Sequence, residues 1–444
     1  MRQLVLFNYD WDQQGFARLS GSYPHESAGF DLFSFPSNAQ LIGFDIERFV
    51  SKLARLAPRK GWSGVVSNHE QFGALAAAML AERMGWPGTP VKAVLACQHK
   101  LYARAVLERV CPDANCGYER LNARYGQSVP AGLNYPAFVK PVKAAFSVLA
   151  RIVHNHAELQ AHTRFGWWEQ WVIRHLVEPF ERVIRDRLPH AGTAHSLMLE
   201  QPMRGQQYNL DGYVFEGKVR GIGVVDAVHY PGTQAFMRFE LPSQLPNHVQ
   251  ARALDVASRF LKAVGFNHGL FNMEFFFDAE TDSLQVIEFN PRMASQFSDL
   301  YRQVRGIDLH QFAFELSQGR DPAWLPVSVP ASGAACSFVY RSFDAQKTVR
   351  MPSAAQLKAL QENFPESLLL AFPKSAGERA RDLKWLGSYR YGILHLAARD
   401  ERQLRQDCLR ASEILGWPAP YADQQPSPKA SPLDLPAHAL SSAS

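Results

Sequence analysis

The stretch Leu270–Arg292, LFNMEFFFDAETDSLQVIEFNPR, decides the fold. It contains two apolar runs separated by the polar segment DAETDS, a pattern that predicts a β-hairpin. Side chains alternate between the two faces of a strand, so Glu288 and Asn290 share one face of this hairpin. We expect Glu274, on the partner strand, to lie opposite them on the same face.

These three side chains predict a metal site. Two carboxylates and one amide oxygen converge with no protein cation expected between them, and such a cluster repels itself unless a hard cation fills it. Magnesium is usually held by one or two carboxylates together with substrate phosphates. The alternative is an edge hairpin whose polar residues face water, and the apolar flanks argue against it. The hairpin therefore predicts a magnesium centre on Glu274, Glu288 and Asn290.

Residues 1–95 are predicted to form an α/β domain. Apolar runs and helical spacing predict strands at Leu4–Tyr9, Asp31–Phe35 and Gly64–Ser67, and helices at Asp45–Ala57 and Glu70–Arg83. Strands that alternate with helices indicate a parallel sheet, whose ligands bind beyond the carboxyl ends of the strands. Asn68, His69 and Glu70 follow the third strand, so they either face a site or cap the next helix.

Residues 96–326 are predicted to form a central domain built around the hairpin. Helices are expected at Gln98–Val110, Phe180–Leu188 and Val249–Val264, and further strands at Tyr135–Pro141, Ser196–Glu200, Gln207–Phe215 and Lys218–Val228. Residues 327–418 read as an α+β subdomain. Residues 419–444 are rich in Pro, Ser and Ala and are expected to be disordered.

The motif NMEFFF…VIEFNPR resembles the metal-binding hairpin of the ATP-grasp superfamily, which includes biotin carboxylase, D-alanine–D-alanine ligase and L-amino-acid ligases. The resemblance implies that Glu274, Glu288 and Asn290 bind two Mg²⁺ ions, with Mn²⁺ as an alternative, and the phosphates of ATP. It also implies that Arg292 lies against the transferring phosphoryl group or the substrate carboxylate.

Two lysines follow the order of the same family. Lys100 in CQHKLYAR matches the lysine that reaches the ATP phosphates, although His99 stands where the family commonly has an acidic residue. Lys140 in AFVKPV matches the strand-borne lysine that bridges the α- and β-phosphates. Taken alone, a lysine at the end of an apolar strand also fits a side chain that reaches out to water.

The nucleotide contacts implied by the resemblance continue along the chain. The phosphate loop of the family is often glycine-rich, whereas PVKAAFSVLARIV contains no glycine, and Lys143 and Ser147 are the candidates to replace its contacts. Glu200 and Gln201 would present backbone groups to adenine, Met203 would cover the ring, and Gln207 would contact the ribose.

The resemblance covers roughly residues 31–306. It implies an α/β (α+β) chain with the ATP-grasp fold, a Rossmann-like N-terminal pre-ATP-grasp domain and a C-terminal α+β cap. The implied function is an ADP-forming, ATP-dependent carboxylate–amine ligase, which activates the acid as an acyl phosphate and joins it to an amine of an amino acid or small metabolite. Lys140 and Arg292 are the implied catalytic residues, and Ser295, Gln296 and Ser298 are candidates for substrate contact.

Three other interpretations remain. A biotin carboxylase-like enzyme fits the length, but the glycine-free loop and the absence of a biotin-accepting Met-Lys-Met argue against it. A non-catalytic ATP-binding module is disfavoured because both glutamates, the asparagine and both lysines are present. The aromatic cluster Phe165, Trp167, Trp168 and Trp171 suggests an interaction scaffold or a substrate pocket, although packing inside a lid or subdomain is the preferred interpretation.

The amino-acid composition limits which classes of partner and which cellular compartment are expected. A net charge of +5 over 444 residues, with no basic cluster, argues against nucleic acid. Five scattered cysteines do not form a disulfide framework and fit a cytoplasmic protein. The longest apolar stretch, Gly73–Ala81, is far shorter than the roughly 20 residues that span a bilayer, so no membrane partner is expected. A homodimer is the default assembly.

Overall fold

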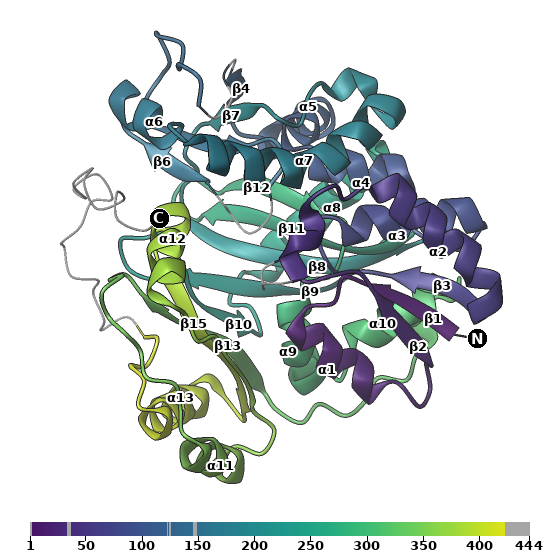
Figure 1. Cartoon of the computed structure of the whole chain (residues 1–444). Coiled ribbons are helices and arrows are strands. Elements are labelled where there is room, and N and C mark those ends of the chain that lie inside the picture. Colours follow the sequence, from purple (N-terminus) through teal and green to yellow (C-terminus); the bar gives the residue numbers. More distant parts are fainter. Residues whose placement is uncertain (1, 33–36, 122, 124–125, 145–148, 422–444) are drawn as a thin grey trace. The chain divides into compact units, whose positions relative to one another are not determined.

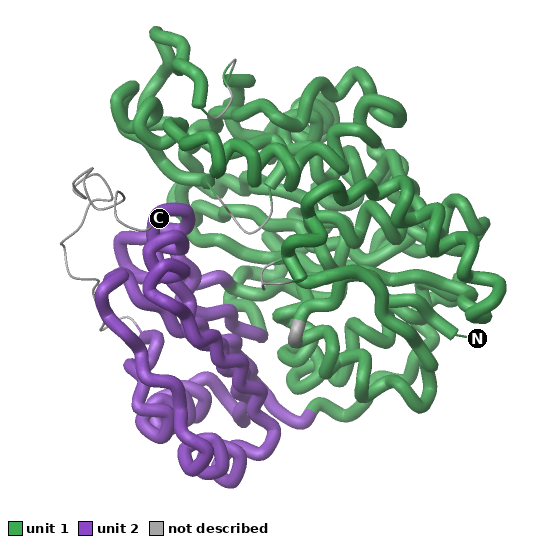
Figure 2. The backbone as a smooth tube through the Cα atoms, in the orientation of Figure 1, with its two compact units in different colours: residues 1–226, 242–330 green, residues 227–241, 331–444 purple. Residues whose placement is uncertain are grey.

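The computed structural model describes residues 2–32, 37–121, 123, 126–144 and 149–421. The chain divides into two compact units, shown in different colours in Figure 2. Unit 1 comprises residues 1–226 and 242–330, and unit 2 comprises residues 227–241 and 331–444. The finer division at residues 95/96 and 326/327 stays a prediction. Residues 422–444, most of the expected disordered tail, lie outside the described part.

The N-terminal region of unit 1 is built on a parallel sheet of order β2-β1-β3, as the alternation of strands and helices predicted. Its strands are β1 (Arg2–Leu6), β2 (His25–Ala28) and β3 (Trp62–Val66). Its helical segments are α1 (Asp10–Arg18), η1 (Ser37–Leu41), α2 (Ile46–Lys60) and α3 (Gly73–Met84). Helices α2 and α3 lie on one side of this sheet (Figure 1).

Two boundaries in this region differ from the sequence predictions. The second strand lies at His25–Ala28, upstream of the predicted Asp31–Phe35, of which residues 33–35 fall outside the described part. Helix α3 begins at Gly73, three residues after the predicted start. A Cβ at Gly73 would lie 2.0 Å from the Ser67 Oγ, so the tight turn between β3 and α3 requires glycine there.

A second, antiparallel sheet of order β4-β7-β5-β6 follows. Its strands are β4 (Tyr118–Leu121), β5 (Ala137–Pro141), β6 (Arg151–Val153) and β7 (Leu197–Glu200). The helical segments before and within it are α4 (Val91–Gln98), α5 (Lys100–Val110), η2 (Pro112–Ala114), α6 (His156–His162), α7 (Trp167–Arg187) and η3 (Pro189–Ala191).

The aromatic cluster is not packed in a subdomain core, contrary to the preferred interpretation. Trp167 and Trp168, in the first turn of α7, are 78% and 55% exposed, and only Phe165 is buried. The Trp168 and Trp171 rings stack on each other with centroids 4.9 Å apart. The Trp168 and Trp171 rings therefore pack against each other on the surface of the helix.

The third sheet of unit 1 contains the predicted hairpin. Its strands are β8 (Gln206–Phe215), β9 (Lys218–His229, which belongs to unit 1 as far as Asp226), β11 (Gly269–Asp278) and β12 (Ser283–Asn290), in the order β12-β11-β8-β9. One face packs against α4, α5 and α8 (Asn247–Ala263) in a single apolar core. Within it the ring of Phe260 stacks on Phe289, 3.8 Å between centroids. The other face carries the polar side chains.

The remaining helical segments of unit 1 follow the hairpin. They are η4 (Ser295–Phe297), α9 (Ser298–Arg305), α10 (Leu309–Ser317) and η5 (Pro322–Trp324). Helix α10 packs against β3 on the side of the parallel sheet away from α2 and α3 (Figure 1). The end of the hairpin is thereby connected to the N-terminal region within the same compact unit.

As far as residue 421, where the described part of the chain ends, unit 2 consists of an antiparallel sheet and three helices, an α+β arrangement. Its strands have the order β10-β13-β15-β14, with β10 (Phe236–Leu241), β13 (Ala334–Ser342), β14 (Leu368–Ala371) and β15 (Tyr389–Ala398). Its helices are α11 (Ala354–Asn363), α12 (Ala376–Leu386) and α13 (Glu401–Leu415). Across the described part of both units, no helix has the length and apolar character needed to cross a membrane.

The stacked pair under the hairpin predicts a large loss of stability on truncation. Phe260 is fully buried, so Phe260→Ala removes its ring contacts and leaves a cavity that should lower the free energy of unfolding by about 3–5 kcal/mol. The urea-denaturation midpoint measures the loss. Ile42→Ala, at a side chain that is 62% exposed, is the control and should change stability by less than about 0.5 kcal/mol. Equal midpoints for the two variants would contradict this core.

Candidate active site

The predicted hairpin is confirmed, and its register aligns the polar side chains. Glu274 on β11 pairs directly with Glu288 on β12, and Asn272 pairs with Asn290. The register shifts between Glu274 and Phe275, which places a β-bulge at Ile287. A bulge re-aims the side chains beside it. Here the two glutamates face each other on the polar side of the sheet.

The expectation that no protein cation lies among these residues is wrong. The Lys100 Nζ lies 2.9 Å from the Glu288 carboxylate. Burial alone would raise the pKa of Glu288, but the ammonium groups of Lys100 and Lys140 hold it below its ordinary value. Lys100 is far from Glu288 in the sequence and begins helix α5, so only the folded chain brings the two together.

Glu274 has no cation of its own among its hydrogen-bond partners. Its two oxygens accept from the Gln207 Nε2 at 3.0 Å and from the Asn290 Nδ2 at 3.1 Å. Burial, and then the negative charge of Glu288, raise the pKa of Glu274 well above its ordinary value. A hard cation placed between the two glutamates would remove this repulsion, so Glu274 and Glu288 fit a divalent ion.

The donor set also fits magnesium in its chemistry. The described residues hold no group of three or more His, Cys, Asp or Glu side chains placed for a metal. A metal at the hairpin would therefore rest on two carboxylates and the Oδ1 of Asn290, with phosphate or water completing its shell. Such partial protein coordination is usual for Mg²⁺.

Arg104 is the buried group that sequence reasoning missed. Its guanidinium donates to the carbonyl oxygens of Val286 and Ile287, at 2.6 and 3.0 Å, and so satisfies the backbone at the bulge. The same guanidinium lies 2.7 Å from the Glu200 carboxylate. Arg104 stands four residues after Lys100, on the same face of α5, and that spacing was the signal available in the sequence.

Glu200 and Lys140 complete this buried group. The Lys140 Nζ lies 2.8 Å from the Glu200 carboxylate and 3.4 Å from the Ile287 carbonyl oxygen. Burial alone would raise the pKa of Glu200, but Arg104 and Lys140 hold it below its ordinary value. The side chain of Glu200 thus serves two cations, a role separate from the backbone contacts predicted for it.

Lys143 is almost fully buried, yet among the described residues it has no carboxylate partner within 4 Å. Its Nζ donates to the carbonyl oxygen of Glu70 at 3.2 Å and lies 5.0 Å from the ring centroid of Phe180. Burial, together with the positive charges of Lys100 and Arg292, lowers the pKa of Lys143 to about 7, although the carboxylates of Glu70 and Glu288 oppose the shift. A buried ammonium group in this setting is suited to bind an anion.

Arg292 is held by the N-terminal region of the same unit. Its guanidinium lies 2.7 Å from the Glu70 carboxylate and 3.2 Å from the Met293 carbonyl oxygen. Helix α3 begins only at Gly73 and has Phe72 as its N-cap, so Glu70 does not cap it. The His69 Nδ1 accepts from the Phe72 N–H at 3.4 Å just before the helix, so both interpretations of Asn68–Glu70, a capping segment and a segment that faces a site, stay predictions.

The other predicted residues lie at the margins of this cluster. Gln201 is exposed and Met203 half-buried, both just after β7. Ser295 is buried and its Oγ has no hydrogen-bond partner in the described part, whereas the Ser298 Oγ lies 3.0 Å from the His310 Nδ1. Ser147 falls outside the described residues.

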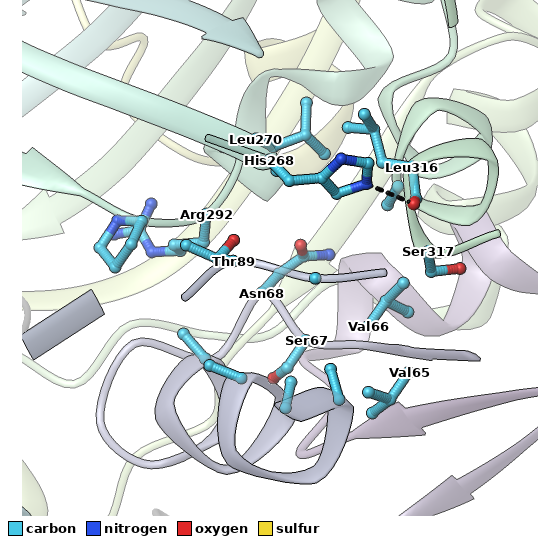
Figure 3. A pocket seen from close by; sticks show the side chains of 18 of the residues that line it. Val65, Val66, Ser67, Asn68, Thr89, His268, Leu270, Arg292, Leu316 and Ser317 are labelled. Carbon is cyan, nitrogen blue, oxygen red and sulfur yellow. Dashed lines mark hydrogen bonds between the residues drawn. The ribbon is translucent and has the colours of Figure 1, made fainter. Parts of the chain in front are cut away.

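A pocket opens beside Arg292, at the free edge of β3 (Figure 3). Its wall is largely apolar, with alanines from α3 and with Leu270 and Leu316. Its polar lining includes Asn68, Thr89 and Arg292. The nearby His268 Nε2 is bound to the Leu316 carbonyl oxygen at 2.6 Å, shown as the dashed line. The arrangement offers space for a small organic group next to the guanidinium.

Arg104→Lys should destabilise unit 1 by about 3–5 kcal/mol. A lysine cannot reach Glu200 and both bulge carbonyls together, so buried acceptors lose their donors. The midpoint of urea denaturation measures the effect. Arg259→Lys, at a half-exposed arginine that binds Asp255 and the Val110 carbonyl oxygen, is the matched control. A loss no larger than that of the control would contradict the role given to Arg104.

Lys143→Met should stabilise the ligand-free protein, more at pH 6 than at pH 9. Below the folded pKa of about 7, the native protein must bury a charged ammonium. Above it the folded lysine is neutral while the unfolded one stays protonated, so wild-type stability rises with pH by up to about 1.4 kcal/mol per unit. Urea midpoints across this range measure the difference, with exposed Lys92→Met as the control. A gain independent of pH would contradict the buried setting.

Comparisons with known proteins agree with this geometry. Residues 133–299 match the ATP-grasp domain family. Carnosine synthase 1 of Gallus gallus is 29% identical over 259 residues, which are 55% of this chain and 26% of the relative. The carbamoyl phosphate synthase large chain of Kineococcus radiotolerans is 22% identical over 346 residues, 71% of this chain and 28% of the relative. The chain therefore spans about a quarter of the length of these curated relatives.

Solved structures are similar over nearly the whole chain. The L-amino acid ligase of Bacillus licheniformis superposes with a TM-score of 0.67 at 14% identity, covering 93% of this chain and 97% of that one. The N5-carboxyaminoimidazole ribonucleotide synthetase of Thermus thermophilus gives 0.61 at 16% identity, covering 94% and 98%. The resemblance seen in the hairpin and the predicted fold class are thus confirmed. Residues 133–299 therefore match an ATP-grasp domain, and the chain shares the fold of these two solved structures.

Proposed function

We propose that this protein is an ATP-dependent, ADP-forming ligase that joins a carboxylic acid to an amine. The observation that carries the proposal is the pair of facing glutamates, Glu274 and Glu288, on a buried sheet face with lysine and arginine side chains around it. Such a set of charges fits a triphosphate with its divalent cation, and an adjacent arginine fits a second anion.

The nucleotide is proposed to lie between the β5–β7 sheet and the hairpin. Lys100 and Lys140 would neutralise its phosphates, and Lys143, which lacks a carboxylate partner among the described residues, would add a third contact. Backbone groups of Glu200 and Gln201 would bind adenine, and Met203 would cover the ring. Gln207 would contact the ribose through its Oε1, because its Nε2 already donates to Glu274. Ser147 is proposed from sequence alone.

Mg²⁺ ions, two by the family resemblance, would be held by Glu274, Glu288 and Asn290 and would supply charge neutralisation of the phosphates. Side chains of the protein set the charge and the orientation of the groups around the metal ions. Lys100 keeps Glu288 ionised, and Asn290 orients Glu274 through its hydrogen bond. Arg292, fixed by Glu70, presents its remaining N–H donors next to the pocket. These groups are ordered before substrate binds, so little reorganisation is needed during the reaction.

The proposed chemistry has two steps. A carboxylate oxygen of the acid attacks the γ-phosphorus, the bond to the β-phosphate oxygen breaks, and an acyl phosphate and ADP form. The nitrogen of the amine then attacks the acyl carbon, phosphate leaves, and one proton is lost from the nitrogen. Lys140 and Arg292 stabilise the charge on the phosphoryl group and on the acyl oxygen, so the rate comes from positioning and electrostatics.

The substrate class is supported by one neighbour's name. The L-amino acid ligase that superposes on 93% of this chain is named for amino acids, which favours an amino acid as one of the two substrates here. The pocket beside Arg292, with its alanine and leucine wall, favours a small substrate with an apolar part. Small molecules are therefore the proposed partners.

The first step can be tested before the amine is known. Hydroxylamine attacks acyl phosphates to give hydroxamates, so wild-type protein, ATP, Mg²⁺ and hydroxylamine are incubated with a panel of carboxylic acids that includes the standard L-amino acids. The proposal predicts acid-dependent ADP and an equal amount of hydroxamate, and no reaction with EDTA. ADP that forms equally without any acid, or ATP binding with no ADP for the whole panel, would contradict it.

Glu288→Gln should lower the rate of acid-dependent ADP formation by at least about 100-fold, because the variant loses one metal-binding carboxylate and the ion pair with Lys100. Glu280→Gln, in the exposed turn of the same hairpin, is the matched control and should react like the wild type. Urea midpoints of both variants check that they are folded. Wild-type turnover by a folded Glu288→Gln protein would remove the metal centre from this position.

A further inference from the structure

The polar face of the sheet extends one strand beyond the metal hairpin. In the register of β12, β11 and β8, Glu288 pairs with Glu274, and Glu274 pairs with Asn209. Neighbouring strands are about 4.8 Å apart, so these residues form a straight row across three strands. Tyr208 and Leu210, on either side of Asn209, belong to the apolar core beneath, which directs the Asn209 side chain to the polar face.

A second row runs parallel to the first, and its hydrogen bonds are satisfied. Asn290 donates to Asn272 at 3.1 Å, and Asn272 donates to Asp211 at 3.1 Å. Asp211 also accepts from the Tyr301 hydroxyl at 3.0 Å and from the Ala294 N–H at 3.4 Å. This row is therefore a finished structural network that supports the hairpin.

In the first row, Glu288–Glu274–Asn209, the side chain at the β8 end is not fully hydrogen-bonded within the described part of the chain. Asn209 is 4% exposed, and within the described part of the chain its Nδ2 has no hydrogen-bond acceptor. Glu274, its neighbour in the row, already accepts from Gln207 and Asn290. A buried N–H without an acceptor is destabilising, and in native proteins a water molecule, an ion or a ligand supplies the acceptor. A substrate bound beside Asn209 would have to offer an acceptor atom.

A second unsatisfied group lies near the same end. Ser295 is 9% exposed, and its Oγ likewise has no partner among the described residues. The preceding residue, Ala294, donates its N–H to Asp211, two positions along β8 from Asn209. The segment after the hairpin thus brings a free hydroxyl toward the strand that carries the free amide.

The two ends of the row Glu288–Glu274–Asn209 differ in their surroundings. Lys100 contacts Glu288 at the β12 end, and Lys140 reaches the bulge carbonyl on the same strand. Two of the lysines proposed for the nucleotide phosphates, Lys100 and Lys140, therefore stand at the β12 end, and Asn209 stands at the other. A group bound at Asn209 lies on the far side of the metal centre from Lys100 and Lys140. The acceptor of a transferred phosphoryl group is expected on that side, because the phosphates of the donor nucleotide lie with the lysines.

We propose that Asn209 is a substrate-binding residue whose Nδ2 donates to an oxygen of the carboxylate that is phosphorylated. This inference rests on the proposed ligase function. A neutral amide suits the position because it binds an anion next to Glu274 and Asp211 without adding charge. Ser295 supplies a second donor to the same acid, which would therefore enter from the β8 side of the sheet.

The test uses Asn209→Ala and Asn209→Asp, with Gln206→Ala, at the exposed first position of the same strand, as the control. The acid is the panel member with the highest wild-type hydroxamate yield. Asn209→Ala should raise KM for the acid about tenfold or more, because a hydrogen bond to a charged oxygen is lost. KM for ATP should stay within about twofold. Asn209→Asp should be worse, since its carboxylate repels the acid, and Gln206→Ala should match the wild type.

Stability separates this role from a structural one. Because the Asn209 Nδ2 has no hydrogen-bond partner among the described residues, Asn209→Ala should not lower the urea midpoint. A drop in the midpoint together with equal changes in both KM values would make Asn209 structural and overturn the proposal. An unchanged KM for the acid would overturn it as well.

A direct binding measurement distinguishes failure of this inference from failure of the ligase function. Thermal shifts are recorded for the wild type and Asn209→Ala with Mg²⁺, a non-hydrolysable ATP analogue and each L-amino acid of the panel. If the wild type binds an acid but forms no hydroxamate, the ligase function fails, and weaker binding by Asn209→Ala still supports the site. Equal binding by the two proteins, or no acid bound by the wild type, overturns the inference.

Discussion

The contact between Arg104 and the bulge of β12 is the constraint on which the rest of the site depends. β12 is the outer strand of its sheet, so the Val286 and Ile287 carbonyl oxygens need donors from outside the sheet. Arg104 supplies them from α5 and binds Glu200 on β7 with the same guanidinium. One planar group thereby fixes the distance between the hairpin and the sheet that carries Lys140. The guanidinium of Arg104 holds several N–H donors in fixed directions within one plane, whereas the ammonium group of a lysine does not.

The charges around the hairpin nearly cancel in the ligand-free protein. Five basic and four acidic side chains take part: Lys100, Lys140, Lys143, Arg104 and Arg292, with Glu70, Glu200, Glu274 and Glu288. Burial of so many charges is tolerable because most are paired. The two groups with the least compensation are Lys143, whose pKa falls, and Glu274, whose pKa rises. An anion would balance the first charge and a cation the second, which supports the proposed binding of a nucleotide with its metal ion.

Sequence reasoning predicted the parts of this site that follow from local periodicity. Alternation along two strands and a polar turn were enough to place Glu274 opposite Glu288. The ATP-grasp fold followed instead from the resemblance of the motif NMEFFF…VIEFNPR to a known family. Sequence reasoning failed where a contact joins distant segments. Arg104 meets a strand that begins 179 residues later in the chain, and Glu70 meets Arg292 across 222 residues. Nothing in the local pattern of α5 or of the turn after β3 encodes those pairings.

The ends of the helices were also predictable only where residues close in sequence determine them. Helix α2 could be read from its spacing, because its amphipathic face and its Asp45 cap lie within one short segment. The start of α3 could not, since it depends on the close approach of Gly73 to Ser67. Likewise, the Trp-rich start of α7 has the composition of a core but stands at the surface.

The central claim, acyl-phosphate formation at the Glu274–Glu288 hairpin, is tested most directly by isotope transfer. The acid is labelled with ¹⁸O in its carboxylate and incubated with ATP, Mg²⁺ and the amine, and the released phosphate is analysed by mass spectrometry. If an acyl phosphate forms, an ¹⁸O atom from the acid appears in the inorganic phosphate, in proportion to the product. Product formation with unlabelled phosphate, or with the label in AMP, would contradict it.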